Sequence, residues 1–282
     1  MGWLISHEAE VFLCIYFGSI LLVATGEAFV PRRALHPGMG SRWSHTILLH
    51  LIDVGLVRWL YPLIGVGVAI WTAERGYGLL NLLDPPAWLA WALTFLALDL
   101  AYYVQHRLLH QVPLLWRLHR VHHTDRDYDF STGLRFHPLE AVFTTGFGLA
   151  VVVALGPPPE AAALYGFIHL GWSLFAHANL RLPLPADRAL RRALVTPDLH
   201  RTHHSAAPGE AMTNFGAVMP LWDRLFGTYL DQPALGHTDM VIGLPAYQDA
   251  RHQRLGDMLL QPFLAEPDAP EASPRAPAEG QA

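Results

Sequence analysis

The sequence predicts an all-α protein whose helices form a bundle within a membrane, and three observations carry this prediction. Hydrophobic residues make up 52% of the 282-residue chain and charged residues only 15%, against about 25% in a typical soluble domain. Several apolar stretches approach the ~20 residues that a helix needs to cross the hydrocarbon core of a bilayer. The chain also has 17 histidines, many of them in short boxes with helical spacing.

The first three apolar stretches are the strongest candidates for membrane-spanning helices. Residues 11–30 contain one charged residue, Glu27, and residues 87–104 contain only Asp99. Residues 46–73 are apolar over a similar or greater length. We therefore expect each stretch to cross the bilayer as a helix.

Two shorter apolar stretches follow, at residues 141–155 and 161–175. About 15 residues is short for a complete span. The Gly-Pro-Pro-Pro sequence at residues 156–159 predicts a turn between them, because proline cannot continue a helix. We interpret the pair as a re-entrant helical hairpin, which gives a polytopic membrane protein with about four spans.

Arginine placement predicts the orientation of the bundle. The residues before the first span contain no Arg or Lys, whereas Arg32, Arg33 and Arg42 follow it. By the positive-inside rule this first loop faces the cytoplasm, and two further crossings return the chain there after residue 104. All three histidine boxes are thus expected on the cytoplasmic side. All 19 basic residues are arginine, a composition that suggests a GC-rich bacterial source and hence a bacterial plasma membrane.

Composition also excludes several classes of protein. The formal net charge of -5 argues against a nucleic-acid partner. Cys14 is the only cysteine, which excludes an internal disulfide, an iron–sulfur cluster or a Cys-rich zinc site held by this chain alone. The segment from Glu266 onward is rich in proline and has no large apolar residue, so we expect a disordered tail over residues 266–282.

The histidine boxes are the main functional signal. They read HRLLH at residues 106–110, HRVHH at 119–123 and HRTHH at 200–204. Residues three or four apart lie on one helix face, so each box presents its imidazoles together. Neutral imidazole binds zinc, iron, copper and nickel. Eight imidazoles exceed the four ligands of one tetrahedral ion, so the boxes predict a site for two metals.

Several other polar residues are candidates for supporting the metal ligands. Asp99 and Tyr103 precede the first box by two turns and one turn of the same predicted helix, and a buried acid there could hold an imidazole. Asn214 follows the last box and could orient a ligand. Glu140 could either support an imidazole or stabilise a helix N-terminus. Five isolated histidines are expected to be ordinary surface residues: His7, His36, His45, His237 and His252.

The boxes resemble those of the fatty acid hydroxylase superfamily, which includes sterol desaturases and sterol methyl oxidases. Further segments match in the expected order: RFHPLE with His137, AHANL with His177, NFG at residues 214–216 and LWDRLFGTY at residues 221–229. The resemblance covers about residues 95–230. It implies a membrane helical scaffold with a cytosolic cap that holds two irons. The metal ligands that it implies are His106, His110, His119, His122, His123, His137, His177, His200, His203 and His204.

The resemblance divides the chain into four expected parts. Residues 1–94 form N-terminal transmembrane helices, and residues 95–230 form the di-iron domain. Residues 231–265 form a C-terminal extension, which precedes the tail.

The resemblance also implies a chemistry, which is the O2-dependent hydroxylation or desaturation of a lipid. Breaking an unactivated C–H bond requires a redox-active metal, and zinc has no redox chemistry. Both reactions begin with hydrogen abstraction, and box spacing does not decide between them. The two electrons per turnover require a separate donor, a reductase or small electron carrier, because the chain has no recognisable flavin or haem module. The alternatives are a zinc-dependent membrane hydrolase with Glu140 as general base, and a non-enzymatic metal-binding membrane protein.

Overall fold

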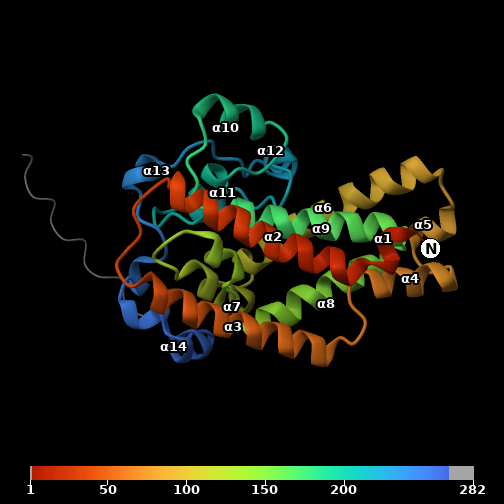
Figure 1. Cartoon of the computed structure of the whole chain (residues 1–282), viewed down its shortest axis with the longest axis horizontal. Coiled ribbons are helices and arrows are strands. Elements are labelled where there is room, and N and C mark those ends of the chain that lie inside the picture. Colours follow the sequence, from red (N-terminus) through yellow and green to blue (C-terminus); the bar gives the residue numbers. More distant parts are fainter. Residues whose placement is uncertain (1, 267–282) are drawn as a thin grey trace, which may run out of the picture.

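The computed structural model describes residues 2–266, and this part of the chain folds into helices without a β-strand (Figure 1). The predicted all-α fold is confirmed. Apart from Glu266, the predicted disordered tail lies outside the described residues. The longer helices are α2 (Glu8–Phe29), α3 (Met39–Leu60), α4 (Val66–Arg75), α6 (Ala87–Gln111), α7 (Pro113–His123), α8 (Pro138–Leu155) and α9 (Pro159–Ala176).

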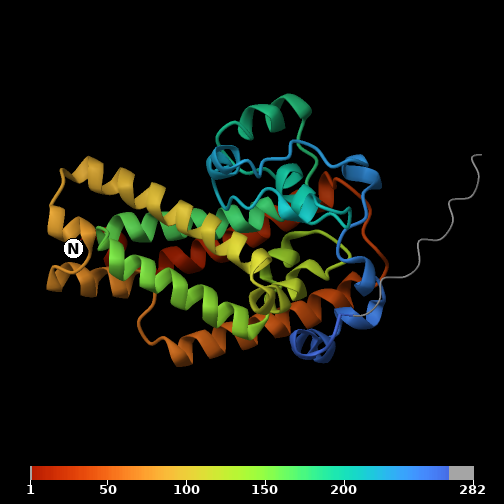
Figure 2. The same ribbon diagram turned by 180° about the vertical axis from the view of Figure 1, so that it is seen from behind.

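The remaining elements are short. At the far end of the bundle lie α1 (Trp3–Ser6) and α5 (Leu79–Leu83). The other short elements are η1 (Phe130–Leu134), α10 (Leu184–Leu190), α11 (Pro197–His203), η2 (Glu210–Met212), α12 (Leu221–Phe226), α13 (Gly236–Asp239), η3 (Pro245–Tyr247), η4 (Ala250–Gln253), α14 (Leu255–Leu260) and η5 (Gln261–Phe263). Together with α7 they form a cap at one end of the long helices (Figures 1 and 2). The N-terminus lies at the opposite end (Figure 1).

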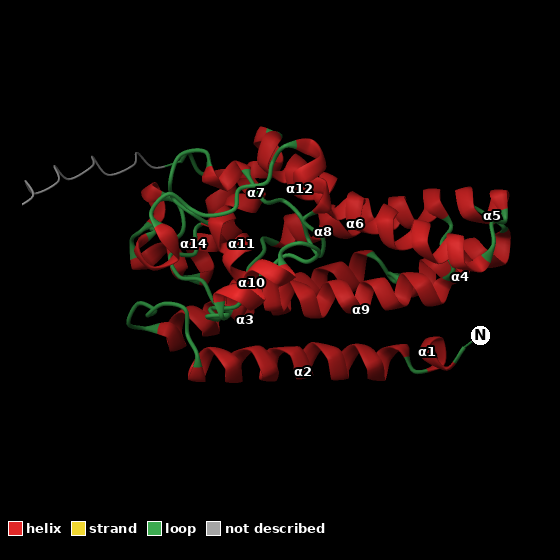
Figure 3. Ribbon diagram, turned by 90° about the horizontal axis from the view of Figure 1, so that it is seen from above, coloured by secondary structure: helices red, strands yellow, loops and turns green. Residues whose placement is uncertain are grey.

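Three helices of the described chain are long and apolar enough to cross a membrane, namely α2, α6 and α8. The outer face of α2 bears large apolar side chains with no protein cover, for example Leu21 at 70% exposure and Leu22 at 75%. Such a face is typical of a helix that contacts lipid. Figure 3 shows α2 at the edge of the bundle, alongside α9. The structure thus indicates an integral membrane protein.

The predicted single span over residues 46–73 is wrong, because the chain breaks there into two helices. The first, α3, ends at Leu60 and the second, α4, begins at Val66. Pro62 follows directly after Tyr61, and the helical backbone conformation is disfavoured for a residue that precedes proline. Gly65 has φ +49° and so takes a left-handed conformation that few other residues adopt.

The turn predicted between the two shorter apolar stretches is confirmed. Helix α8 ends at Leu155, Gly156 follows with φ +61°, and α9 begins at Pro159. Both helices have 18 residues, more than the 15 expected, because each begins before its apolar stretch. At ~1.5 Å per residue each is roughly 27 Å long, close to the thickness of the hydrocarbon core.

Two sets of polar contacts attach the cap to the membrane helices. Arg42, near the start of α3, lies with a guanidinium nitrogen 2.7 Å from a carboxylate oxygen of Asp129 and another 3.3 Å from Asp125. Glu27, near the end of α2, accepts hydrogen bonds of 2.8 Å from the backbone N–H groups of Phe130 and Asn179. Arg42 and its two carboxylates are buried and paired, as burial requires. Together with the half-buried Glu27 they hold η1 against both helices.

Candidate metal centre

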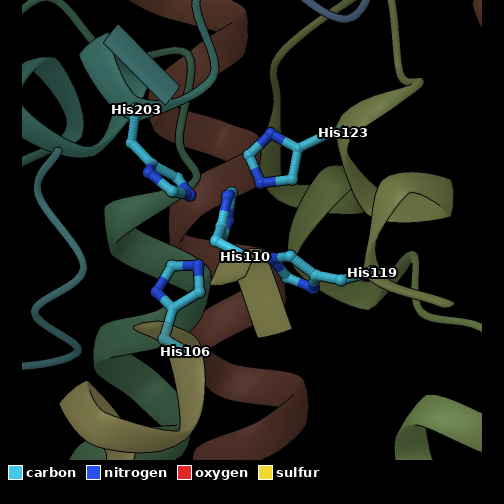
Figure 4. A group of neighbouring side chains, drawn as sticks. All are labelled: His106, His110, His119, His123 and His203. Atoms are coloured by element: carbon cyan, nitrogen blue, oxygen red, sulfur yellow. The ribbon is translucent and has the colours of Figure 1, made fainter. Parts of the chain in front are cut away.

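Nine of the ten histidines expected as ligands lie together where the cap meets the bundle. Within each of two groups, one nitrogen of every ring lies within 4.8 Å of one nitrogen of every other ring. The first group is His106, His110, His119, His123 and His203. The second group is His122, His177, His200 and His204. Figure 4 shows the first group, with rings from α6, α7 and α11 converging on one space.

Helical spacing explains how the boxes divide between the groups. In every box the two histidines four residues apart stay in one group, and in the two boxes with a third histidine that residue joins the other group. On α7, His119 and His123 belong to the first group and His122 to the second. On α11 the arrangement is reversed, since His200 and His204 belong to the second group and His203 to the first. Helices α7 and α11 therefore each contribute to both groups, as one centre for two ions requires.

Hydrogen bonds orient most of the rings and set their tautomers. A ring nitrogen that faces a carbonyl or a carboxylate must carry the proton and donate it, which leaves the other nitrogen with a lone pair for a metal. The Nδ1 atoms that donate in this way are those of His106 to the Phe215 carbonyl (3.0 Å), His203 to Thr213 (2.7 Å), His122 to Arg135 (3.2 Å), His177 to Ser173 (2.8 Å) and His119 to the Glu140 carboxylate (2.6 Å).

The remaining ring nitrogens fit bound cations. Within the described chain, the buried Nε2 atoms of His110, His119, His123, His203 and His204 have no hydrogen-bond partner. The Nε2 atoms of His122 and His177 lie 3.2 Å apart, and both have lone pairs because their Nδ1 atoms carry the protons. Two facing lone pairs repel unless a cation lies between or beside them. Imidazole nitrogen is also a donor that suits iron, copper, nickel and zinc.

The protein environment keeps these rings neutral. Burial, followed by repulsion from neighbouring imidazoles, holds the pKa of His122, His123, His200 and His203 well below 6.5. Burial likewise lowers the pKa of His177 to about 4. Neutral imidazole is the form that binds metals, so these rings need lose no proton at neutral pH.

His137 is the one expected ligand that lies outside both groups. Its Nδ1 accepts a hydrogen bond from the backbone N–H of Leu139 at the start of α8, and its Nε2 donates to the Leu259 carbonyl at 3.2 Å. Both ring nitrogens are thus used to cap a helix and to hold the C-terminal extension. The structure gives His137 no free nitrogen for a metal, and we leave it out of the ligand set.

The three residues expected to support ligands, Asp99, Tyr103 and Asn214, hydrogen-bond to residues outside the histidine boxes. Asp99 accepts hydrogen bonds from Tyr165 and from the Trp222 indole at 2.9 and 2.8 Å, and Tyr103 lies 3.0 Å from the Thr228 hydroxyl. Asn214, at φ +54°, donates to the Leu199 carbonyl, which directly precedes His200. None of these three side chains contacts an imidazole nitrogen in the described structure.

Glu140 contacts a ligand, and Asp223 supports one through the backbone. Glu140 bonds His119 directly. Asp223 accepts hydrogen bonds of 2.8 Å from the backbone N–H groups of Phe215 and Gly216. The Phe215 carbonyl in turn accepts a hydrogen bond from His106 Nδ1. Asp223 therefore holds the segment that orients a ligand.

The expectation that His237 is a surface residue is wrong. Its side chain is buried, its Nε2 donates a hydrogen bond of 3.0 Å to Gln232 Oε1, and this nitrogen lies 3.6 Å from a carboxylate oxygen of Asp198. Burial lowers its pKa to about 4. This contact depends on α13 folding back over α11, a long-range feature without a local sequence signal.

A cavity of about 470 Å³ leads from the metal centre into the bundle. Its inner end is lined by His106, His119, His122, His177 and His200. The rest of the lining comes mainly from α2, α3, α6, α8 and α9, with η1 and loop residues near the metal centre, and is mostly apolar. A narrower cavity of about 200 Å³, between α6, α8 and α9, shares Tyr102 and Gln105 with it. Concave, mainly apolar sites with a few polar groups are typical of small-molecule binding.

The fold and site define a class of protein: a helical membrane protein with a histidine-rich centre sized for two metals at one end of its bundle. Residues 91–228 match the family model described as Fatty acid hydroxylase. Over this region the chain matches the fatty acid hydroxylase family, in agreement with the resemblance of its histidine boxes.

The chain is also similar to several named proteins. The chain is 33% identical over 172 residues to an alkylglycerol monooxygenase of Xenopus tropicalis, covering 60% of this chain and 36% of the relative. It is 34% identical over 142 residues to the ornithine lipid hydroxylase OlsE of Rhizobium tropici, covering 50% and 41%. It is 27% identical over 139 residues to human cholesterol 25-hydroxylase, covering 47% and 48%.

The match therefore covers less than half the length of each of these relatives. No solved structure matches the chain. The names describe monooxygenases and hydroxylases of lipids, which supports an oxidoreductase that modifies a lipid.

Proposed function

We propose that the protein is a membrane-bound, O2-dependent oxidoreductase that hydroxylates a lipid at a di-iron centre. The observation that carries this proposal is the position of two metal-sized histidine groups at the inner end of a largely apolar cavity. A lipid chain in that cavity would lie beside the metals. The bilayer around the helices would supply such a substrate without passage through water.

Nine histidines would hold the two irons, in the groups of five and four described above. Bound iron supplies the redox chemistry that activates O2 and abstracts hydrogen from an unactivated carbon. The balanced reaction is R–H + O2 + 2 e⁻ + 2 H⁺ → R–OH + H2O. The two electrons come from a separate donor, a reductase or small electron carrier.

The protein side chains position the reactants. Glu140 and the four backbone carbonyls that receive Nδ1–H groups hold five imidazoles in fixed orientations. Apolar lining residues such as Leu109, Leu134 and Phe136 keep water from the reacting carbon. We propose hydroxylation over desaturation because the relatives' names describe hydroxylases and monooxygenases.

We further propose that the centre faces the cytoplasm of a bacterial cell. Arg32 and Arg33 lie in the loop at the cap end, Arg42 lies near the start of α3 at the same end, and the N-terminus lies at the other end. The positive-inside rule then assigns the cap to the cytoplasm, where reduced electron carriers are available.

One observation keeps a zinc-dependent hydrolase as a second candidate. Glu140 lines the cavity, and its Oε2 is buried without a hydrogen-bond partner in the described structure. A free carboxylate oxygen beside a metal is what a hydrolytic general base requires. A hydrolase needs neither iron nor O2.

Metal analysis and O2 uptake distinguish the two candidates. We expect about two irons per chain in protein purified from cells grown without added zinc. We also expect O2 consumption, with a supplied reductant, that matches the hydroxylated lipid found by mass spectrometry. His122→Ala should abolish both, whereas His252→Ala should retain both, because the His252 ring packs against Tyr247 and belongs to neither histidine group. An active enzyme with zinc and no iron would replace this proposal with the hydrolase.

A further inference from the structure

Four polar aromatic side chains lie deep in the bundle along the main cavity. They are Tyr16 on α2, His50 on α3, Tyr102 on α6 and His169 on α9, and all four line the cavity. We call them the deep polar cluster. They take no part in the metal centre, and the mechanism above does not use them.

The cluster lies at the depth of the hydrocarbon core. His169 precedes His177 by eight residues along α9 and the following turn, which places it roughly 12 Å from the metal centre. Tyr16 and His50 lie near the middle of α2 and α3. Their chain neighbours Phe17 and Leu51 are 61% and 59% exposed on the outer surface. Polar groups at this depth are costly and mark a functional site.

The contacts within the cluster leave polar atoms free to bind a ligand. The Tyr16 hydroxyl lies 2.9 Å from His50 Nε2, a hydrogen bond that joins α2 to α3 at the cavity. The Tyr102 and His169 rings stack with their centres 3.7 Å apart. Neither the Tyr102 hydroxyl nor the His169 ring has a hydrogen-bond partner among residues 2–266, and both face the cavity. By contrast, the neighbouring Tyr165 hydroxyl donates a hydrogen bond to the Asp99 carboxylate.

The charge of the lining restricts the ligand group. Among the described residues that line this cavity, none is an arginine, and the one acid, Glu140, lies at the metal end. A phosphate, carboxylate or ammonium group would lack a counter-ion there and would be costly to bury. Tyrosine hydroxyls and imidazoles suit an uncharged oxygen, which accepts or donates one hydrogen bond.

We propose that the deep polar cluster is a binding subsite for an uncharged oxygen-bearing group, a hydroxyl or carbonyl, on the substrate lipid. This rests on the proposed function for its substrate class. The subsite lies roughly 12 Å from the metals, so its hydrogen bond selects which carbon reaches them. It discriminates an oxygen-bearing lipid from a plain hydrocarbon chain of the same length.

The test compares two probes that differ by one hydroxyl, 1-hexadecanol and hexadecane. The full chain is placed in nanodiscs, and the protein-dependent retention of each radiolabelled probe is measured, with empty nanodiscs as background. We expect the parent to prefer the alcohol. His169→Phe keeps the stacked ring and removes both nitrogens, and Tyr16→Phe removes one hydroxyl. Each should lower retention of the alcohol about three- to tenfold, the effect of one hydrogen bond, and leave hexadecane unchanged.

Two further variants make the result specific. His169→Gln retains hydrogen-bonding atoms and should restore part of the preference for the alcohol. Tyr61→Phe removes a hydroxyl that donates to the Val142 carbonyl and does not line the cavity, so it should change nothing. Equal retention of both probes by the parent, or equal loss of both in the variants, would overturn the subsite.

The same measurements on metal-free protein separate the two proposals. If the alcohol preference persists and depends on His169 while the metal-loaded enzyme oxidises no lipid, the proposed function fails and the subsite stands. If lipid is hydroxylated but His169→Phe alters neither alcohol retention nor the carbon oxidised, the subsite fails and the function stands.

Discussion

The hydrogen bond between Glu140 and His119 gives the most direct quantitative prediction. The two atoms lie 2.6 Å apart, and the two side chains are only 1% and 2% exposed. A hydrogen bond to a charged partner contributes about 1.5–3 kcal/mol. Because 1.4 kcal/mol corresponds to a factor of ten, Glu140→Ala should weaken metal binding about 10- to 100-fold. This range agrees with measured effects of residues that orient metal-binding histidines.

Glu140→Gln separates charge from hydrogen bonding. The amide oxygen can still accept from His119 Nδ1, so the loss in metal affinity should be about tenfold or less. The assay is dialysis of iron-loaded protein against a series of buffered chelator concentrations, with iron per chain measured by mass spectrometry. Glu160→Gln is the control, because Glu160 lies at the far end of the bundle and accepts only from the backbone of Gly2.

Two results would contradict this reasoning. If Glu140→Ala binds iron within twofold of the parent, the hydrogen bond does not support the ligand. If Glu140→Gln binds metal normally but loses more than a thousandfold in activity, Glu140 acts on the substrate, as the hydrolase candidate requires.

Four other predictions follow from the same structure. His203→Ala should lose iron and lipid oxidation but still insert into the membrane. Metal analysis of membrane fractions measures both the iron content and the inserted protein. Loss of insertion would show that His203 has a role in folding. Burial lowers the pKa of His237 to about 4 in the folded protein, so the unfolded chain binds this proton at a higher pH than the folded chain does. The free energy of unfolding therefore falls as pH falls from 6.5 toward 4. His237→Gln should show a smaller loss of melting temperature between pH 7 and pH 5. In a chain with Cys14→Ser, cysteines at Ser6 and Arg251, both exposed, should be labelled from opposite sides of intact cells. Removal of the residues after Glu266 should leave activity unchanged, and loss of activity with normal insertion would show that the tail has a function.

The parts of the site that were predictable are those encoded locally. Spacings of three and four residues place histidines on one helix face, so the gathering of the three boxes at one candidate metal centre could be predicted from the sequence. The assignment of rings to the two groups was not predictable, because it depends on how α7 and α11 face each other. His137 matches the family pattern by position, but its nitrogens are used by Leu139 and Leu259.

The fold shows the same division between local and long-range information. Pro62 and Gly65 carried a local signal for the break between α3 and α4, and the high hydropathy of residues 46–73 concealed it. The pairing of Tyr16 with His50 had no such signal, since 34 residues and a loop separate them. Burial of His237 likewise depends on Asp198 in a distant segment.

The orientation of four imidazoles by backbone carbonyls has a consequence for how this centre tolerates mutation. A carbonyl is present whatever side chain its residue bears, so many substitutions at Thr213 preserve the partner of His203. Position 140 has no such freedom, because there the partner is the side chain itself. In a library with each position fully randomised, functional clones should show wide variety at residue 213 and a narrow choice of acids and amides at residue 140. Main-chain partners thus make the orientation of four of the nine rings tolerant of side-chain substitution.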